Sequence, residues 1–101
     1  MKKDVREILN SFTQGLEELA ETNKSNVNAF MRLLKTGYRE GALSTKTKEL
    51  MSVAIAVYNR CEYCIVYHVY KSLELGATRE EIIEAAMVAV GFGGGPSMAY
   101  S

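Results

Sequence analysis

The stretch ELMSVAIAVYNRCEYCIVYH, Glu49–His68, joins an apolar helix to a cluster of reactive side chains. After the first turn of this helix the segment Leu50–Tyr58 has almost no polar face, which is typical of a helix surrounded by protein. Asn59 and Arg60 interrupt the run, and CEYCIVYH, Cys61–His68, opens another helix. These eight residues hold both cysteines and the single histidine of the chain. The stretch therefore predicts two consecutive helices with a site near their junction.

Two amphipathic helices are predicted before this stretch. Apolar residues recur at steps of three and four over about residues 4–21 and again over about residues 25–36. Asn23 and Ser25 are N-cap candidates for the second of these helices, which stops at Gly37. Residues 38–43 form a connector, and Ser44 can cap the apolar helix that follows.

Turn and capping residues follow the reactive cluster. Gly76 closes the helix that the cluster opens. Thr78 and Glu81 have the spacing of a capping box, so a further helix runs from there through Val90. The glycine-rich residues 91–95 end or bend this helix, and Pro96 can start a short last turn. Because this run lacks a Lys-Ser/Thr ending and a preceding strand, a phosphate loop is disfavoured.

The whole chain is predicted to form one domain, residues 1–101. It has a single proline and few segments in which apolar and polar residues alternate. We therefore expect an all-α bundle of about five to six helices without strands. The apolar share of 48% is generous for so short a chain, and a small domain leaves much of its surface wet. Both facts favour a homo-oligomer.

Charge and hydropathy exclude several classes of partner. Lys plus Arg and Asp plus Glu are both 12, and no basic run appears, so no nucleic acid is expected. Charged residues stand near the start, where a signal peptide needs an apolar core, and the longest apolar run, residues 85–90, is far too short for a membrane span. We expect a cytoplasmic protein without membrane contact. In that reducing compartment two cysteines are better explained as reactive or metal-binding than as a permanent staple.

The spacing of the reactive side chains suits thiol chemistry. On a helix Cys61, Cys64 and His68 share one edge, because residues three, four and seven apart lie on the same face. A free thiol has a pKa of about 8.5, and a helix N-terminus or an adjacent imidazole lowers that pKa. Cys64 is expected in the first turn with His68 one turn later, so both the helix N-terminus and the imidazole can lower the pKa of its thiol.

The second cysteine can trap the oxidised first one. If Cys64 is oxidised to a sulfenic acid, Cys61 can attack it, close a disulfide and release water. A disulfide needs β-carbons about 3.5–4.5 Å apart, closer than the roughly 5–6 Å of helical residues three apart. Cys61 should therefore lie at the helix start, where its backbone can adjust.

Glu49 is the third candidate element of the site. It falls in the first turn of the apolar helix, where the dipole favours a carboxylate, and it can face inward while Lys46 and Lys48 face water. A buried carboxylate must be paired, and His68 is a natural partner that would be held in one tautomer.

Other readings of the cluster stay open. Both cysteines, His68 and Glu49 are legitimate zinc ligands, although structural zinc sites usually draw their pairs from separated segments. The chain could also be a scaffold module in which the cysteines are small buried hydrophobes. The spacing disfavours covalent haem, and the sequence predicts no cofactor and no resident metal.

From about residue 43 to residue 100 the chain resembles the AhpD-like alkyl hydroperoxidase family, within the carboxymuconolactone decarboxylase superfamily. The resemblance rests on Glu49, an eleven-residue gap, the Cys61-x-x-Cys64-x-x-x-His68 motif and the turn and helix start of residues 75–81. Tyr63 stands where well-known members carry a second histidine, and those members are about twice as long, with two copies of the fold.

The resemblance implies an all-helical fold that assembles into trimers or hexamers. It also implies a thiol peroxidase or disulfide reductase in which Cys64 attacks a hydroperoxide, Cys61 resolves the product, and His68 with Glu49 relays protons. Relatives of this kind are reduced by a lipoylated or other thiol protein. Lactone decarboxylation, the activity in the superfamily name, is an alternative that the paired cysteines disfavour, because members with that activity lack them.

Overall fold

The computed structural model of the chain describes residues 4–101 and is helical throughout its regular parts. The helices are α1 (Val5–Tyr38), α2 (Thr45–Asn59), α3 (Glu62–Glu74), α4 (Arg79–Gly93) and α5 (Gly95–Tyr100). No strand occurs in residues 4–101, so the predicted all-α fold is confirmed. Within the same residues no helix combines the length and the apolar character needed to cross a membrane.

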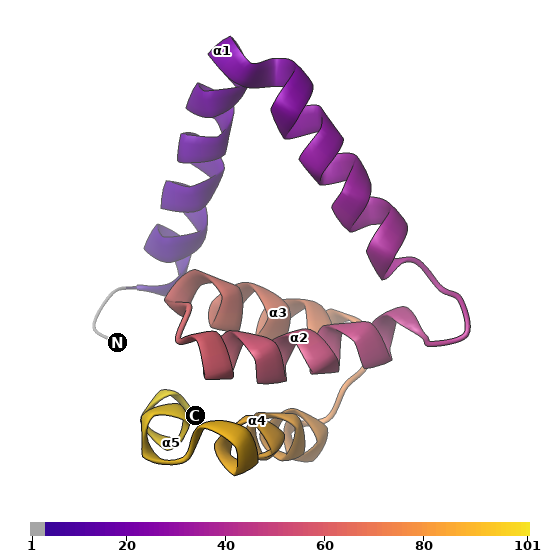
Figure 1. Cartoon of the computed structure of the whole chain (residues 1–101), viewed down its shortest axis with the longest axis vertical. Helices are drawn as coiled ribbons and strands as arrows, with labels where there is room; N and C mark the ends of the chain where they lie inside the picture. Colours follow the sequence, from indigo (N-terminus) through magenta and orange to yellow (C-terminus); the bar gives the residue numbers. More distant parts are fainter. Residues whose placement is uncertain (1–3) are drawn as a thin grey trace.

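Helix α1 is two helical arms joined at a sharp bend. Asn23 has non-helical angles, φ −129° and ψ 40°, and Figure 1 shows the arms diverging from this point as a V. The predicted break between two N-terminal helices is therefore confirmed. The predicted stop at Gly37 is one residue early, because side chains of α2 hold the last carbonyls of α1 and the helix continues through Tyr38.

The predicted helix starts have their capping bonds. The side chain of Ser44 accepts from the backbone N–H of Thr47 at 3.0 Å. Thr78 and Glu81 form a complete capping box, with Glu81 N–H donating to Thr78 Oγ1 at 3.1 Å and Thr78 N–H donating to Glu81 Oε1 at 2.8 Å. Such caps satisfy orphan N–H groups of the first turn, so local sequence alone locates these boundaries.

Positive φ angles mark the turns between the later helices. Gly76, with φ +87°, ends the turn after α3, as the sequence predicts. Helix α4 continues past Val90 to Gly93, and the bend falls at Gly94, where φ is +64°. Pro96 then lies in the first turn of α5. Only a residue without a β-carbon adopts such angles at little cost, so the glycines fix where the chain turns.

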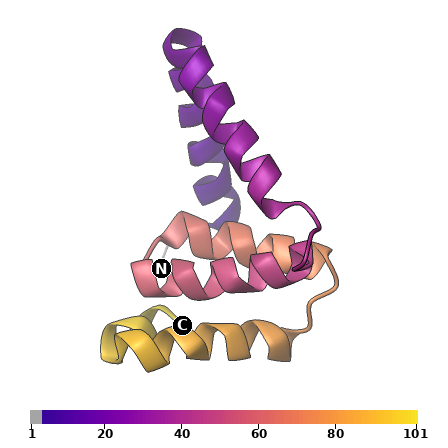
Figure 2. The same cartoon turned by 45° about the vertical axis from the view of Figure 1, so that its right-hand side comes forward.

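Helix α2 lies between α3 on one side and α4 with α5 on the other (Figures 1 and 2). Its inward side chains, chiefly Val53 and Val57, are almost completely buried, and Val57 packs with Ala86 and Ala89 of α4. Within one chain α2 is not covered by protein on all sides. Its outer face, which includes Ile55 and other large side chains, is about half exposed, because no other element of this chain covers it.

Candidate active site

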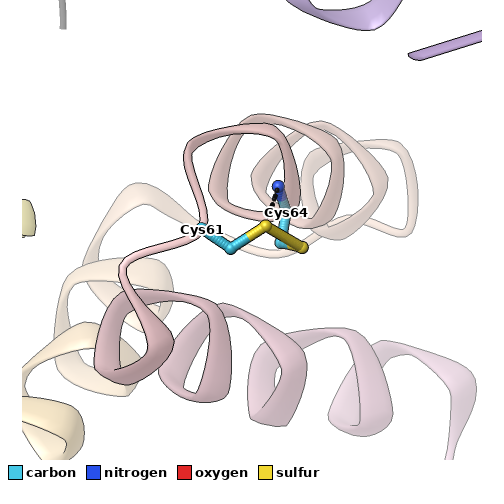
Figure 3. The surroundings of a disulfide bond; sticks show 2 residues. All are labelled: Cys61 and Cys64. Carbon is cyan, nitrogen blue, oxygen red and sulfur yellow. Dashed lines mark hydrogen bonds between the residues drawn. A yellow bond between two sulfur atoms is a disulfide. The ribbon is translucent and has the colours of Figure 1, made fainter.

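The two cysteines form a disulfide at the start of α3. Figure 3 shows both sulfur atoms on the side of α3 that faces α2, with the Cys61–Cys64 pair joined across the first turn. The two Cα atoms are 5.2 Å apart, within the usual range for a disulfide. Both residues are partly buried. The site is thus a pair of sulfurs at the α2–α3 junction rather than a disulfide at a loop tip.

The backbone of Cys61 explains how residues three apart can be bridged. Cys61 is the N-cap of α3, and its φ of −97° and ψ of 101° are extended rather than helical. Its sulfur also accepts a hydrogen bond from the backbone N–H of Cys64 at 3.2 Å. The expected position at the helix start is confirmed. The positive end of the helix dipole consequently lies close to both sulfurs and not to Cys64 alone.

Glu49 and His68 form a close pair between α2 and α3. Nδ1 of the imidazole lies 2.6 Å from Oε1 of the carboxylate, and the two side chains are only 19% and 7% exposed for His68 and Glu49 respectively. A carboxylate has no proton to donate, so Nδ1–H is the donor and Nε2 keeps its lone pair in the neutral ring. The predicted contact is present, and it fixes the tautomer with Nε2 as the free base.

Three further residues contact His68, one at its backbone and two at its ring. The hydroxyl of Ser72 donates to the backbone carbonyl of His68 at 2.7 Å. The ring of Tyr67 meets the imidazole edge-on, with centroids 5.1 Å apart, and the ring of Tyr38 lies nearly parallel to it at 5.8 Å. The imidazole therefore lies in an aromatic setting with a single carboxylate partner.

An aromatic contact links α1 to the site helix. The ring of Tyr63, the residue before Cys64, stacks on Phe12 of the first arm of α1 with centroids 4.0 Å apart. Partial burial, and then the neighbouring Tyr67, raise the pKa of the Tyr63 hydroxyl above its ordinary value. Tyr63 is thus a packing group that keeps its proton at neutral pH.

Sequence reasoning missed the contribution of α1 and one role of a lysine. Lys48 is expected to face water, and at the surface its ammonium also donates to the carbonyls of Gly37 at 2.9 Å and Arg39 at 2.7 Å. Lys46 lies over a third exposed and pairs with Glu81 at 3.1 Å. The carbonyls at the end of a helix attract a nearby cation, but periodicity does not say which lysine reaches them.

The geometry offers little to a metal ion. Within residues 4–101 no three His, Cys, Asp or Glu side chains come together as a ligand group. With both sulfurs in a disulfide, His68 and Glu49 are the only other members of the proposed zinc set. A zinc site would need the disulfide opened and the four groups rearranged.

The fold and this site define a class of small all-α proteins that carry a Cys-x-x-Cys disulfide beside a glutamate–histidine pair. The sequence model of the carboxymuconolactone decarboxylase family matches residues 26–101. The chain belongs to this family, in agreement with the resemblance to its AhpD-like members.

The chain is also similar to one curated relative and to solved structures of family members. An uncharacterized protein from Cupriavidus necator is 30% identical over 101 residues, which cover all of this chain and 89% of that protein. A carboxymuconolactone decarboxylase family protein from Legionella pneumophila, solved in its apo form, is similar with a TM-score of 0.91 and 36% identity, over 95% of this chain and 86% of that one. A family member from Thermotoga maritima with a suggested part in the antioxidative response has a TM-score of 0.81 and 33% identity, over 93% and 80% of the two chains.

Proposed function

We propose that this protein is a thiol-dependent peroxidase that reduces hydroperoxides through a Cys61–Cys64 dithiol–disulfide cycle. The observation that carries the proposal is one helix start that holds both sulfurs, with a carboxylate-bound imidazole one turn further along. Thiolates, not thiols, attack peroxides, and a helix N-terminus beside a base supplies them near neutral pH. The suggested antioxidative role of the Thermotoga maritima neighbour supports the same chemistry.

The oxidative half of the cycle begins with the dithiol. Nε2 of His68 takes the proton of the Cys64 thiol, and the thiolate attacks an oxygen of ROOH. The O–O bond breaks, Cys64 becomes a sulfenic acid, and the leaving alkoxide receives the proton from His68 to give ROH. The Cys61 sulfur then attacks the sulfenic sulfur, an S–S bond forms and water leaves. This half ends in a Cys61–Cys64 disulfide, the oxidation state that the structure contains.

The reductive half consumes an external dithiol. One thiolate of that dithiol attacks the disulfide to form a mixed disulfide, and its second thiol releases the protein thiols. The balance of a full cycle is one hydroperoxide and one dithiol converted to an alcohol, water and one external disulfide. A lipoylated protein or another protein thiol has the required chemistry. No metal and no bound cofactor take part.

We also propose that the working form is a homo-oligomer, a trimer or a hexamer. Large apolar side chains exposed on α2 and α4 border a hollow of about 220 Å³, and Phe92 at its edge is 85% exposed. The hollow is lined by Ala54, Ile55, Tyr58, Val88, Ala89 and Phe92. A second copy is the occupant we favour, because the chain has no net charge to repel itself and most of its large apolar side chains are exposed rather than buried in its own core.

Intact-mass measurement tests the peroxidase directly. The fully reduced protein should lose two hydrogens on treatment with one equivalent of an organic hydroperoxide, with Cys61 linked to Cys64. Cys61→Ser should stop at a sulfenic acid on Cys64, which a dimedone probe traps, whereas Cys64→Ser should remain reduced. Two thiols that persist in the wild type, with circular dichroism intact, would leave the scaffold reading in place, and a retained zinc mass would favour the metal reading.

A further inference from the structure

We propose that Tyr38, at the end of α1, is a positioning residue that holds the His68 imidazole in the orientation needed to serve the cysteines. The two rings are nearly parallel, with an interplanar angle of 8° and centroids 5.8 Å apart. Tyr38 belongs to a helix that carries none of the reactive residues. The inference rests on the proposed function in one respect, namely that His68 Nε2 is the base.

A second restraint on His68 is needed because Glu49 fixes only one point of the ring. The hydrogen bond from Nδ1 to the carboxylate sets the tautomer and ties one ring atom, but χ1 and χ2 of His68 can still change together around that bond and swing the ring. Tyr38 lies along one face of the imidazole, and Tyr67 meets it edge-on. Together the two tyrosines limit that swing, which keeps the direction of the Nε2 lone pair constant.

Tyr38 is itself fixed through its hydroxyl. This hydroxyl is hydrogen bonded to Oγ of Ser52, a buried side chain of α2. Ser52 donates its only hydroxyl proton to the carbonyl of Lys48 at 2.8 Å, so Tyr38 must be the donor in the first bond. The order of bonds from Tyr38 to Ser52 to the α2 backbone is therefore determined.

The backbone around Tyr38 is also tied to the first turn of α2. Thr45 Oγ1 donates to the carbonyl of Tyr38 at 2.7 Å, and Lys48 Nζ bridges the carbonyls of Gly37 and Arg39. Three consecutive carbonyls at the end of α1 thus have side-chain donors from α2. Glu49 directly follows Lys48 and lies just beyond this first turn, so the start of α2 fixes both the carboxylate and the aromatic neighbour of His68.

Nitrogen NMR of the imidazole tests this inference, because a tag-free chain contains a single histidine. In the wild type the Nδ1 and Nε2 resonances should be well separated, as one tautomer requires. Tyr38→Leu should broaden them and move them toward each other, while Tyr38→Phe, which keeps the ring, should restore most of the separation. Tyr70→Leu, a half-exposed tyrosine of α3, is the matched control and should leave the resonances unchanged.

Thiol reactivity gives a second readout. In the reduced Cys61→Ser background, Tyr38→Leu should slow alkylation of Cys64 by iodoacetamide by about tenfold, as misplacement of an activating group does. A folded Tyr38→Leu protein with wild-type resonances and a wild-type alkylation rate would overturn the inference.

If Tyr38→Leu does not fold, Ser52→Ala tests the inference instead, because it removes the acceptor of the tyrosine hydroxyl and keeps both rings. Ser52→Ala should broaden the resonances measurably, and unchanged resonances would overturn the inference. Absence of peroxide turnover in the wild type would defeat the proposed function alone, since neither readout uses peroxide.

Discussion

The two arms of α1 and the α2–α4 body are built on different principles. The body buries the side chains that hold it together, including Val53 and Val57, and it carries the disulfide and the Glu49–His68 pair. Over its 34 residues α1 buries only Ile8 and Val27, and its two arms run from the body to a bend that lies away from it (Figure 1). The body is stabilised by its own core, whereas α1 presents an apolar stripe with little to cover it.

The difference shows what α1 contributes. The site chemistry is contained in α2, α3 and the N-cap of α3, and α1 meets it with one ring from each arm, Phe12 against Tyr63 and Tyr38 against His68. Between these two contacts most of its large apolar side chains are exposed. A helix of this kind contacts an existing site with a few side chains and leaves most of its apolar stripe uncovered within its own chain.

The largest expected effect is on the rate of hydroperoxide turnover, and it comes from a residue of the body. His68→Gln keeps a polar side chain beside Glu49 but removes the base, so hydroperoxide turnover should fall by about 10²-fold or more, the usual contribution of a general base. Stopped-flow kinetics of the reduced protein measure this. A matched change in α1, Phe12→Leu, should alter the rate far less. Equal losses from both substitutions would contradict a site that is contained in the body.

A smaller effect separates the two regions by stability. Val57→Ala removes two methyl groups from a closed core and should lower the free energy of unfolding by about 2 kcal/mol at every protein concentration. Leu33, 67% exposed on the second arm of α1, should behave differently. Leu33→Ala should be within about 0.5 kcal/mol of wild type in the dissociated chain but should weaken the assembly.

Denaturant titrations at several protein concentrations, with sedimentation velocity, distinguish these outcomes. The loss of unfolding free energy caused by Leu33→Ala should grow with protein concentration, because this substitution weakens only the proposed contact between copies. A loss of unfolding free energy that is the same at all protein concentrations would mean that Leu33 stabilises this arm within its own chain.

The smallest effect is a pH dependence at the start of α4. The backbone N–H of Thr78, and then Lys46, hold the pKa of Glu81 below its ordinary value of 4.5. A carboxyl whose pKa is lowered by folding stabilises the fold fully above its unfolded-state pKa, and this contribution is lost as pH falls through the folded-state value. Glu81→Gln should therefore lower the unfolding temperature slightly at pH 7, and this difference should shrink as the solution is acidified below the ordinary value of 4.5.

Glu84→Gln, at an exposed position on the same helix without a cap bond, is the control for this prediction. It should change the unfolding temperature by less than Glu81→Gln at pH 7. A difference between Glu81→Gln and wild type that persists undiminished in acid would show that the charge of Glu81 is not what stabilises the cap.

Much of the fold could be predicted from local sequence because its signals act within one helical turn. The caps at Ser44 and Thr78, the turn at Gly76 and the break at Asn23 all lie where the sequence places them. Boundaries that depend on other helices were less accurate. Tyr38 remained helical because side chains of α2 bond the last carbonyls of α1, a long-range interaction that periodicity cannot reveal.

The candidate site likewise has a part that local sequence predicts and a part that helix packing decides. The spacing of Cys61, Cys64 and His68 along one helix requires them to share an edge, so their proximity follows from the period of the helix. The inward orientation of Glu49 was one of two choices that the sequence allowed, and the packing of α2 against α3 made it. Tyr38 gave no sequence signal, since its position in a predicted connector is uninformative.

By itself the sequence determined an all-helical chain with two thiols and an imidazole on one helix edge, because hydrogen bonding and side-chain periodicity within a helix are local. The tertiary structure decided which carboxylate meets the imidazole, which tyrosine lies against it, and which apolar faces remain uncovered. Those choices depend on how the helices pack, and packing is set by shape and burial between residues far apart in the chain.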